Sequence, residues 1–399
     1  MHTATFVGWM LVTGALGQTI TPKAIDEQNK IFQDWWGTSL ECRFDGLPAK
    51  GSVPDFRIPY SGHIYPDSAG GTVRVLRKYD QAFHGGVNLA TRHEQWDTSA
   101  YQRTAYVRRT YRYGPFGRRV GTRLVRVTRT PYWHGHCNGW AAATIRYAEP
   151  QKTVVRNGVS FTPADIKALL AEVYMYQDEV VLAGETSLVS PEMFHLIMAN
   201  WIGRFSHPVA MEASPGREKW NYPIYKFRSS ATPRGRDRVD VKTWVTYAQS
   251  SRGEYDKSPR IAREKYFHYL LELDDAGQIV GDQHYRDSSR IDMLWVPKPP
   301  VPSRQEGNAR GNPHLDVNQV VAIWRASVPD EICQQWHNYE SRSAEATQLS
   351  ETADSGETIR PASAATPVRD ASTSEETAAP TAAREAGGEP SRTGTPPSE

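Results

Sequence analysis

Two kinds of hydrophobic periodicity occur along the chain, and they separate a helical part from a strand-rich part. Apolar residues recur at helical spacing in residues 162–176, which begin with the capping sequence Thr162-Pro163-Ala164-Asp165, and again in residues 191–203. Small residues predict a third helix over residues 138–147. Residues 241–248 instead alternate apolar and polar side chains, and residues 266–286 have the form of a hairpin with its turn at residues 275–277. Because the helices come first and the strands later, the sequence predicts an α+β fold.

The two ends of the chain differ in composition from the part between them. Residues 1–17 contain an apolar stretch of signal-peptide length, too short to span a bilayer, so we expect a signal peptide and no membrane partner; a first core helix is the alternative. Residues 338–399 are mostly Ala, Ser, Thr, Glu, Pro and Gly, and from Glu340 onward they hold 5 basic and 11 acidic residues. Such a segment cannot bury enough apolar surface to fold, so we expect a disordered tail.

A strongly basic segment precedes the predicted core. Between Arg103 and Arg129 the chain has nine arginines and no acidic residue, with tyrosines among them. Arginine with aromatic side chains is typical of nucleic-acid surfaces, but residues 123–129 (RLVRVTR) alternate with period two, as a half-exposed strand does. We therefore expect a basic strand-rich face in an N-terminal region, 18–130, ahead of a core at 131–337. Polyanion binding is the alternative, and nucleic acid is not an expected partner.

Cys137 is the candidate nucleophile. Cys42 and Cys333 could form one disulfide and leave Cys137 unpaired, as an exported thiol enzyme needs; three unpaired thiols are the alternative. Cys137 begins a predicted helix, where free N–H groups and the helix dipole favour a thiolate. Its backbone N–H would also be placed to stabilise an oxyanion. We therefore expect a reactive thiol of low pKa, with a buried structural cysteine as the alternative.

A catalytic base is predicted on the hairpin rather than beside the cysteine. His134 and His136 are close in sequence, but neighbours on a tight turn point apart, and His136 could cap the helix. His268 lies on the strand at 266–273. With a three-residue turn it stands opposite His284, and Asp282 lies diagonally on the same face, where it could orient the imidazole. Asp287 lies further along the chain and could reach His268 only if the hairpin contained a bulge.

A zinc site is not expected near the cysteine. His134, His136 and Cys137 crowd three potential ligands into four residues, and no second cluster completes a tetrahedral site.

Three further segments have a distinctive pattern. They are W-x-G-x-C-x-G-W-A, which starts at Trp133, the peptide KWNYPIYKF at 219–227, and the hairpin at 266–281 followed by DMLWVP at 292–297. Together they resemble segments of the transglutaminase elicitor family. The resemblance implies a papain-like core in which the helix bearing the nucleophile packs on an antiparallel sheet. It also implies a Cys-His-Asp arrangement of Cys137, His268 and Asp282, calcium-dependent transglutaminase activity, and secretion. Where relatives read Gly-Gly-Glu-Trp, this chain reads GDQH at 281–284, and Asp287 is the alternative third residue.

The predicted activity is acyl transfer through a thioester on Cys137, from a protein glutamine to a lysine amine. The expected partners are therefore proteins with accessible Gln and Lys. A papain-like cysteine peptidase or deamidase that uses the same residues is one alternative; a non-enzymatic polyanion-binding envelope protein is another. Calcium is expected from the resemblance alone, since the chain has no EF-hand loop. We also expect residues 220–227 to form an exposed or rim segment, because Pro223 interrupts regular strand pairing, with Trp220 and Phe227 docked beside the core.

Overall fold

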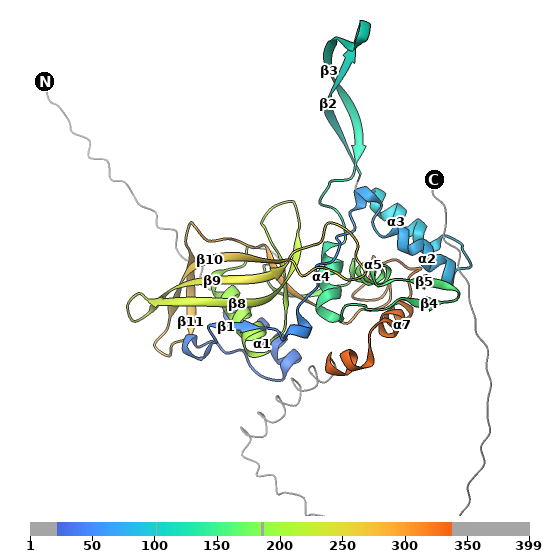
Figure 1. Ribbon diagram of the computed structural model, residues 1–399. Helices are drawn as coiled ribbons and strands as arrows, with labels where there is room; N and C mark the ends of the chain where they lie inside the picture. Colours follow the sequence, from blue (N-terminus) through green and yellow to red (C-terminus); the bar gives the residue numbers. More distant parts are fainter. Residues whose placement is uncertain (1–21, 101, 185–186, 337–399) are drawn as a thin grey trace, which may run out of the picture. The chain divides into compact units, whose positions relative to one another are not determined.

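An antiparallel sheet of eight strands forms one half of the fold. The computed structural model describes residues 22–100, 102–184 and 187–336, so the predicted signal peptide and tail lie outside the described residues. The strand order is β11-β10-β9-β8-β7-β12-β6, with β1 paired to β8 (Figure 1). The strands are β1 (Lys50–Ser52), β6 (Glu179–Ala183), β7 (Val209–Glu212), β8 (Asn221–Pro233), β9 (Arg238–Ala248), β10 (Ala262–Leu273), β11 (Ile279–His284) and β12 (Met293–Pro297).

Helices come mostly before the long strands, as the sequence predicts. They are α1 (Pro22–Trp36), α2 (Val73–Phe83), α3 (Leu89–Ala100), α4 (Cys137–Arg146), α5 (Pro163–Tyr174), α6 (Pro191–Ile197) and α7 (Val317–Ser327). The predicted start of α5 is confirmed, because the Thr162 hydroxyl accepts from the Asp165 N–H and the Asp165 carboxylate accepts from the Thr162 N–H. A wider turn of helix, Met198–Arg204, continues α6. The prediction of a mixed helical and antiparallel fold is therefore confirmed. In the part of the chain that the structure describes, no helix has the length and apolarity of a membrane span.

Helix α4 packs tightly against α5, and this contact explains its small residues. Ala141 and Ala143 are fully buried. At Gly139 an added Cβ would lie 2.1 Å from the Ala171 carbonyl oxygen of α5, so no larger residue fits there. The other side of α4 meets strand β8. Helix α4 is thus fixed between α5 and the sheet.

Residues on both sides of position 130 contribute to the same core. Tyr65, Leu76 and Tyr79 share one hydrophobic cluster with α4 and α5. The second large cluster lies between the sheet and the α6 segment, and includes Phe32 of α1. Residues 22–130 are therefore part of the unit that carries α4.

Residues 220–227 do not form an exposed rim, so that prediction is wrong. Most of them belong to β8, an interior strand between β7 and β9. Pro223 is tolerated because it pairs only with Ala210 of β7, and the pairing with β9 begins one residue later, at Ile224. The local irregularity that proline suggests is present as a bulge between Ile224 and Lys226.

Cys42 and Cys333 are free thiols, so the suggested disulfide is not formed. Cys42 packs against the large cluster beneath the sheet. Cys333 packs in a separate small cluster with Val328 and Trp336.

The arginine-rich segment forms a two-stranded ribbon rather than one face of a larger sheet. Strands β2 (Arg103–Tyr113) and β3 (Arg119–Arg129) pair only with each other. A shorter hairpin, β4 (Val154–Arg156) and β5 (Val159–Phe161), likewise stands outside the large sheet.

Candidate active site

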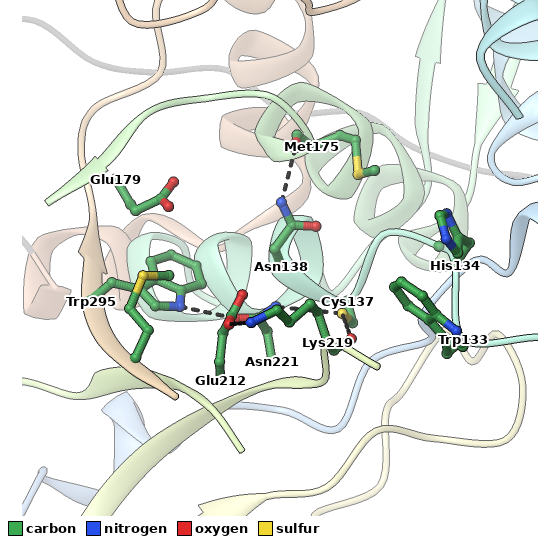
Figure 2. Close-up of a pocket in the computed structure, with 12 residues that line it drawn as sticks. Trp133, His134, Cys137, Asn138, Met175, Glu179, Glu212, Lys219, Asn221 and Trp295 are labelled. Carbon is green, nitrogen blue, oxygen red and sulfur yellow. Dashed lines mark hydrogen bonds and ion pairs between the residues drawn. The ribbon is translucent and has the colours of Figure 1, made fainter. Parts of the chain in front are cut away.

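Cys137 is the first residue of α4 and lines a cavity of about 230 Å³. Figure 2 shows the side chains around this cavity. They come from the turn before α4 and its first turn, from the end of α5, from the loop before β8, and from strands β6, β7, β8 and β12: Trp133, His134, Gly135, Asn138, Met175, Glu179, Glu212, Lys219, Asn221, Met293 and Trp295.

The turn that leads into α4 is held by the segment at residues 64–67. The His136 N–H donates to the Ile64 carbonyl at 2.7 Å, and the Asp67 N–H donates to the His134 carbonyl at 3.1 Å. Gly135 is required between them, because a Cβ there would lie 2.7 Å from the Ile64 carbonyl oxygen. These contacts place Cys137 at the helix start with its side chain in the cavity.

The Cys137 thiol is held by residues of β8 and the loop before it. Its Sγ lies 3.5 Å from the Lys219 carbonyl oxygen, and the Asn221 Nδ2 donates to Sγ at 3.6 Å. The Trp295 Nε1, which can only donate, bonds to the Asn221 Oδ1 at 2.9 Å. Trp295 therefore fixes the side-chain amide of Asn221 with its nitrogen toward the sulfur (Figure 2).

Burial dominates the protonation of this thiol. Cys137 is only 5% exposed, and burial raises its pKa above the ordinary value of 9.0, although N–H groups of Asn221 and Asn138 lower it. The prediction of a low-pKa thiolate is therefore wrong, because the desolvation of the sulfur outweighs the favourable end of the helix.

We expect Cys137 to react slowly with iodoacetamide at pH 7 and faster only as the pH rises toward and above 9. A raised pKa keeps the sulfur protonated at neutral pH, and the reactive thiolate appears at alkaline pH. Mass spectrometry of the peptide that carries Cys137, after timed alkylation from pH 5 to 10, measures this rate. Urea-unfolded protein is the control for an unperturbed thiol. A midpoint near or below pH 7 in the folded protein would contradict the expectation.

His268 is not brought to Cys137. It lies on β10 opposite Lys242 of β9, which in turn pairs with Ser230 of β8. Ser230 is nine residues along β8 from Asn221, a distance of about 30 Å at the rise of a strand. His268 bonds instead to Asp287 through Nδ1 at 2.9 Å and to Asp240 through Nε2 at 3.1 Å. His268 therefore has two acidic partners, but Cys137 lies far from it.

Asp282 is likewise placed elsewhere, because the hairpin register is shifted by one residue. The predicted turn forms, with the Asp274 N–H donating to the Gln278 carbonyl. A bulge between Glu272 and Leu273 then pairs Leu271 with Asp282. Since one residue of shift moves a side chain to the other face of the sheet, Asp282 lies on the face opposite His268. Its carboxylate accepts from the Glu192 N–H at the start of α6.

His134 shares the cavity with Cys137, and sequence reasoning set it aside. Its Nδ1 lies 4.0 Å from the Asp67 Oδ2, and its ring contacts the Trp133 ring, with 4.1 Å between centroids. Burial and the charge of Arg103 lower the pKa of His134, so the imidazole is neutral at pH 7. Burial raises the pKa of Asp67 to about 6, against the lowering effect of His136. No sequence signal links Asp67 to this turn. Asn221 and Trp295 lie in the segments that carry the family resemblance.

His136 does not cap α4 through its side chain but belongs to a buried ionic cluster. Its Nε2 donates to the Glu172 Oε2 at 2.9 Å and lies 3.6 Å from the Glu94 Oε1. The Glu172 carboxylate also accepts from the Thr72 hydroxyl at 2.6 Å. Burial lowers the pKa of His136, but Glu94 and Glu172 outweigh this and raise it to about 10. His136 is therefore an imidazolium at neutral pH.

This cluster does not fit a calcium ion. Among the described residues, Glu94, His136 and Glu172 form the one group of three side chains close enough to share a metal. Calcium prefers six to eight oxygen ligands, whereas here a protonated imidazole occupies the space between the carboxylates. A requirement for calcium therefore stays a prediction, and only the family resemblance supports it.

The fold places a cysteine at the start of a helix that packs on an antiparallel sheet, with its side chain in a cavity. The family model described as Transglutaminase elicitor matches residues 125–188, which include Cys137. The fold is similar to the crystal structure of the GP42 transglutaminase from Phytophthora sojae, with a TM-score of 0.58 and 21% sequence identity over 78% of this chain and 99% of that chain. The search of curated proteins found no match. The predicted resemblance to the transglutaminase elicitor family is thus confirmed.

Proposed function

We propose that this protein is a secreted acyltransferase of the transglutaminase type, with Cys137 as its nucleophile. The observation that carries the proposal is the position of Cys137 at the start of α4, with its sulfur in the cavity and oriented by Asn221. A nucleophile-bearing helix packed on an antiparallel sheet also suits the papain-like arrangement that the family resemblance implies.

In the proposed reaction His134 is the base and Asp67 orients it. As the Cys137 sulfur attacks the carboxamide carbon of a protein glutamine, the thiol proton passes to the neutral imidazole of His134. The oxyanion accepts hydrogen bonds from the Cys137 backbone N–H and the Asn221 side-chain amide. His134 returns the proton to the leaving nitrogen, ammonia departs, and a thioester remains on Cys137. A lysine amine then attacks the thioester and loses a proton to His134, so that an isopeptide bond forms and the thiol is restored.

The two pKa shifts suit this mechanism. A raised pKa for Cys137 and a lowered pKa for His134 make the neutral thiol and neutral imidazole the resting pair at pH 7. The proton then moves only as the substrate carbonyl accepts the sulfur, which is general-base catalysis.

The proposal is tested with casein and a fluorescent primary amine. Wild-type protein is expected to incorporate the amine, and His134→Ala to lose about a hundredfold or more of this activity because the base is removed. His268→Ala is the matched control and should keep near wild-type activity per folded molecule. If His268→Ala lost the activity and His134→Ala kept it, His268 would have to reach Cys137 in the active state. Peptide cleavage without amine incorporation by the wild type would identify a cysteine peptidase instead.

Trp133→Ala is expected to shift the products several-fold from amine incorporation toward deamidation. Trp133 lines the cavity beside His134, where its ring can exclude water while admitting the apolar stem of a lysine. Trp140 does not share this position: it is buried and donates to the Tyr60 carbonyl. Mass spectrometry of a glutamine peptide with excess amine reports both products. Tyr132→Ala, at an exposed neighbouring position, is the control. An unchanged product ratio in folded Trp133→Ala would contradict the proposed role of the Trp133 ring in excluding water.

A further inference from the structure

The β2–β3 ribbon carries a positive charge that the described part of the chain does not neutralise. All nine arginines between Arg103 and Arg129 lie on or between its strands, and no ion pair joins any of them to an acidic residue among those described. The register sets Arg103 directly opposite Arg129, and Arg109 opposite Arg123. Like charges in directly paired positions destabilise a sheet. An anionic partner would offset this cost.

The ribbon exposes apolar as well as basic side chains. Tyr106 is 68% exposed, Leu124 is 64% exposed, and Phe116 in the turn is 94% exposed. Arginine and aromatic residues together are the types that most often dominate binding at protein interfaces. Arginines occupy both faces, since Arg108 and Arg109 point in opposite directions along β2. A ribbon that lies flat on a lipid surface needs an apolar face separate from its polar face. This ribbon has arginines on both faces, so it does not have such an apolar face.

The base of the ribbon adjoins the candidate active site. Strand β3 ends at Arg129, four residues before Trp133 in the cavity wall. At the start of β2, the charge of Arg103 contributes to the lowered pKa of His134. A molecule that binds along the ribbon and reaches its base therefore comes close to the place where a glutamine must enter.

We propose that the β2–β3 ribbon binds an acidic segment of the glutamine-bearing protein substrate, and so selects acyl donors with acidic flanks. The inference rests on the proposed function. Eleven residues of strand span about 36 Å, so the acidic residues would lie within about ten residues of the glutamine in an extended substrate. Arginine suits this role because its planar guanidinium can bind a carboxylate with two hydrogen bonds. A protein partner is favoured over nucleic acid because the adjoining cavity must receive a protein side chain.

The test compares two glutamine peptides that differ only in four positions about six residues from the glutamine, which are Glu in one and Ser in the other. Wild-type protein is expected to show a KM about tenfold lower for the acidic peptide at low salt, as four exposed ion pairs would give. The variant R108T/R109T/R123T/R126T should lose this preference and keep its kcat on the serine peptide. The control R43T/R236T/R252T/R286T removes four exposed arginines elsewhere and should keep the preference.

Four outcomes separate the possibilities. Equal KM values for the two peptides in wild type would overturn the inference, as would a preference that survives in the ribbon variant. Fluorescence anisotropy with labelled acidic peptide measures binding without turnover. If no peptide is turned over but the ribbon still binds the acidic peptide, the proposed function is wrong, whereas the ribbon is still a binding surface for acidic segments. Binding of duplex DNA is measured in the same way at equal salt. If the ribbon binds DNA more tightly than the acidic peptide, the partner is a nucleic acid and the inference of a protein partner is wrong.

Discussion

Cys137→Ser is expected to lower amine incorporation into casein by about a thousandfold or more while the fold is retained. A serine hydroxyl fits the space of the thiol and can keep the contact with Asn221, but it is a far weaker nucleophile at neutral pH. The loss therefore reports the chemistry of the sulfur rather than its packing. The measurement is the initial rate with a fluorescent amine, normalised to folded protein by circular dichroism.

The other two cysteines are the matched controls for this substitution. Cys42 and Cys333 are free thiols that do not line the cavity, so Cys42→Ser and Cys333→Ser should retain activity. If Cys137→Ser retained activity and one of these lost it, the nucleophile would have to be sought elsewhere. The same result would remove the proposed roles of Asn221 and His134.

Glu172→Gln is expected to lower the free energy of unfolding by about 3 kcal/mol, because it leaves the buried His136 cation without its carboxylate partner. Burial raises the pKa of Glu172, but the hydrogen bond and charge of His136 outweigh this and keep the carboxyl ionised. Burial and the charge of Glu172 raise the pKa of Glu94 to about 8, so Glu94 is the carboxyl of this pair that more readily takes up a proton. Glu94 also lies farther from the His136 Nε2, at 3.6 Å against 2.9 Å for Glu172, so Glu94→Gln should lower the free energy of unfolding by less than about 1 kcal/mol.

Urea unfolding of both variants at pH 7 measures this difference. Equal losses for Glu94→Gln and Glu172→Gln would show that the two carboxyls share the negative charge. A negligible loss for Glu172→Gln would show that His136 is neutral in the folded protein. Because His136 directly precedes Cys137, a parallel measurement of amine incorporation shows whether the cluster also positions the nucleophile.

Features that depend on neighbours in the chain could be predicted from the residues alone. The start of α5 follows from Thr162, Pro163 and Asp165, because a helix cap is made by groups three residues apart. The turn at Asp274 and the helix that begins at Cys137 are equally local, as is the change from helical to alternating periodicity that gives the α+β class. For the same reason Cys137 could be identified as the candidate nucleophile.

The neighbours of Cys137 could not be read from the chain, because they depend on contacts between distant segments. Asn221 lies 84 residues from Cys137 in the sequence, and Trp295 a further 74 residues on. Burial by these segments raises the pKa of the thiol that a helix start would otherwise lower. One bulged residue near Leu273 moved Asp282 to the wrong face of the sheet, since a strand alternates its side chains with a period of two. Local sequence placed the sulfur at the start of a helix, and long-range packing chose which groups surround it and how readily it ionises.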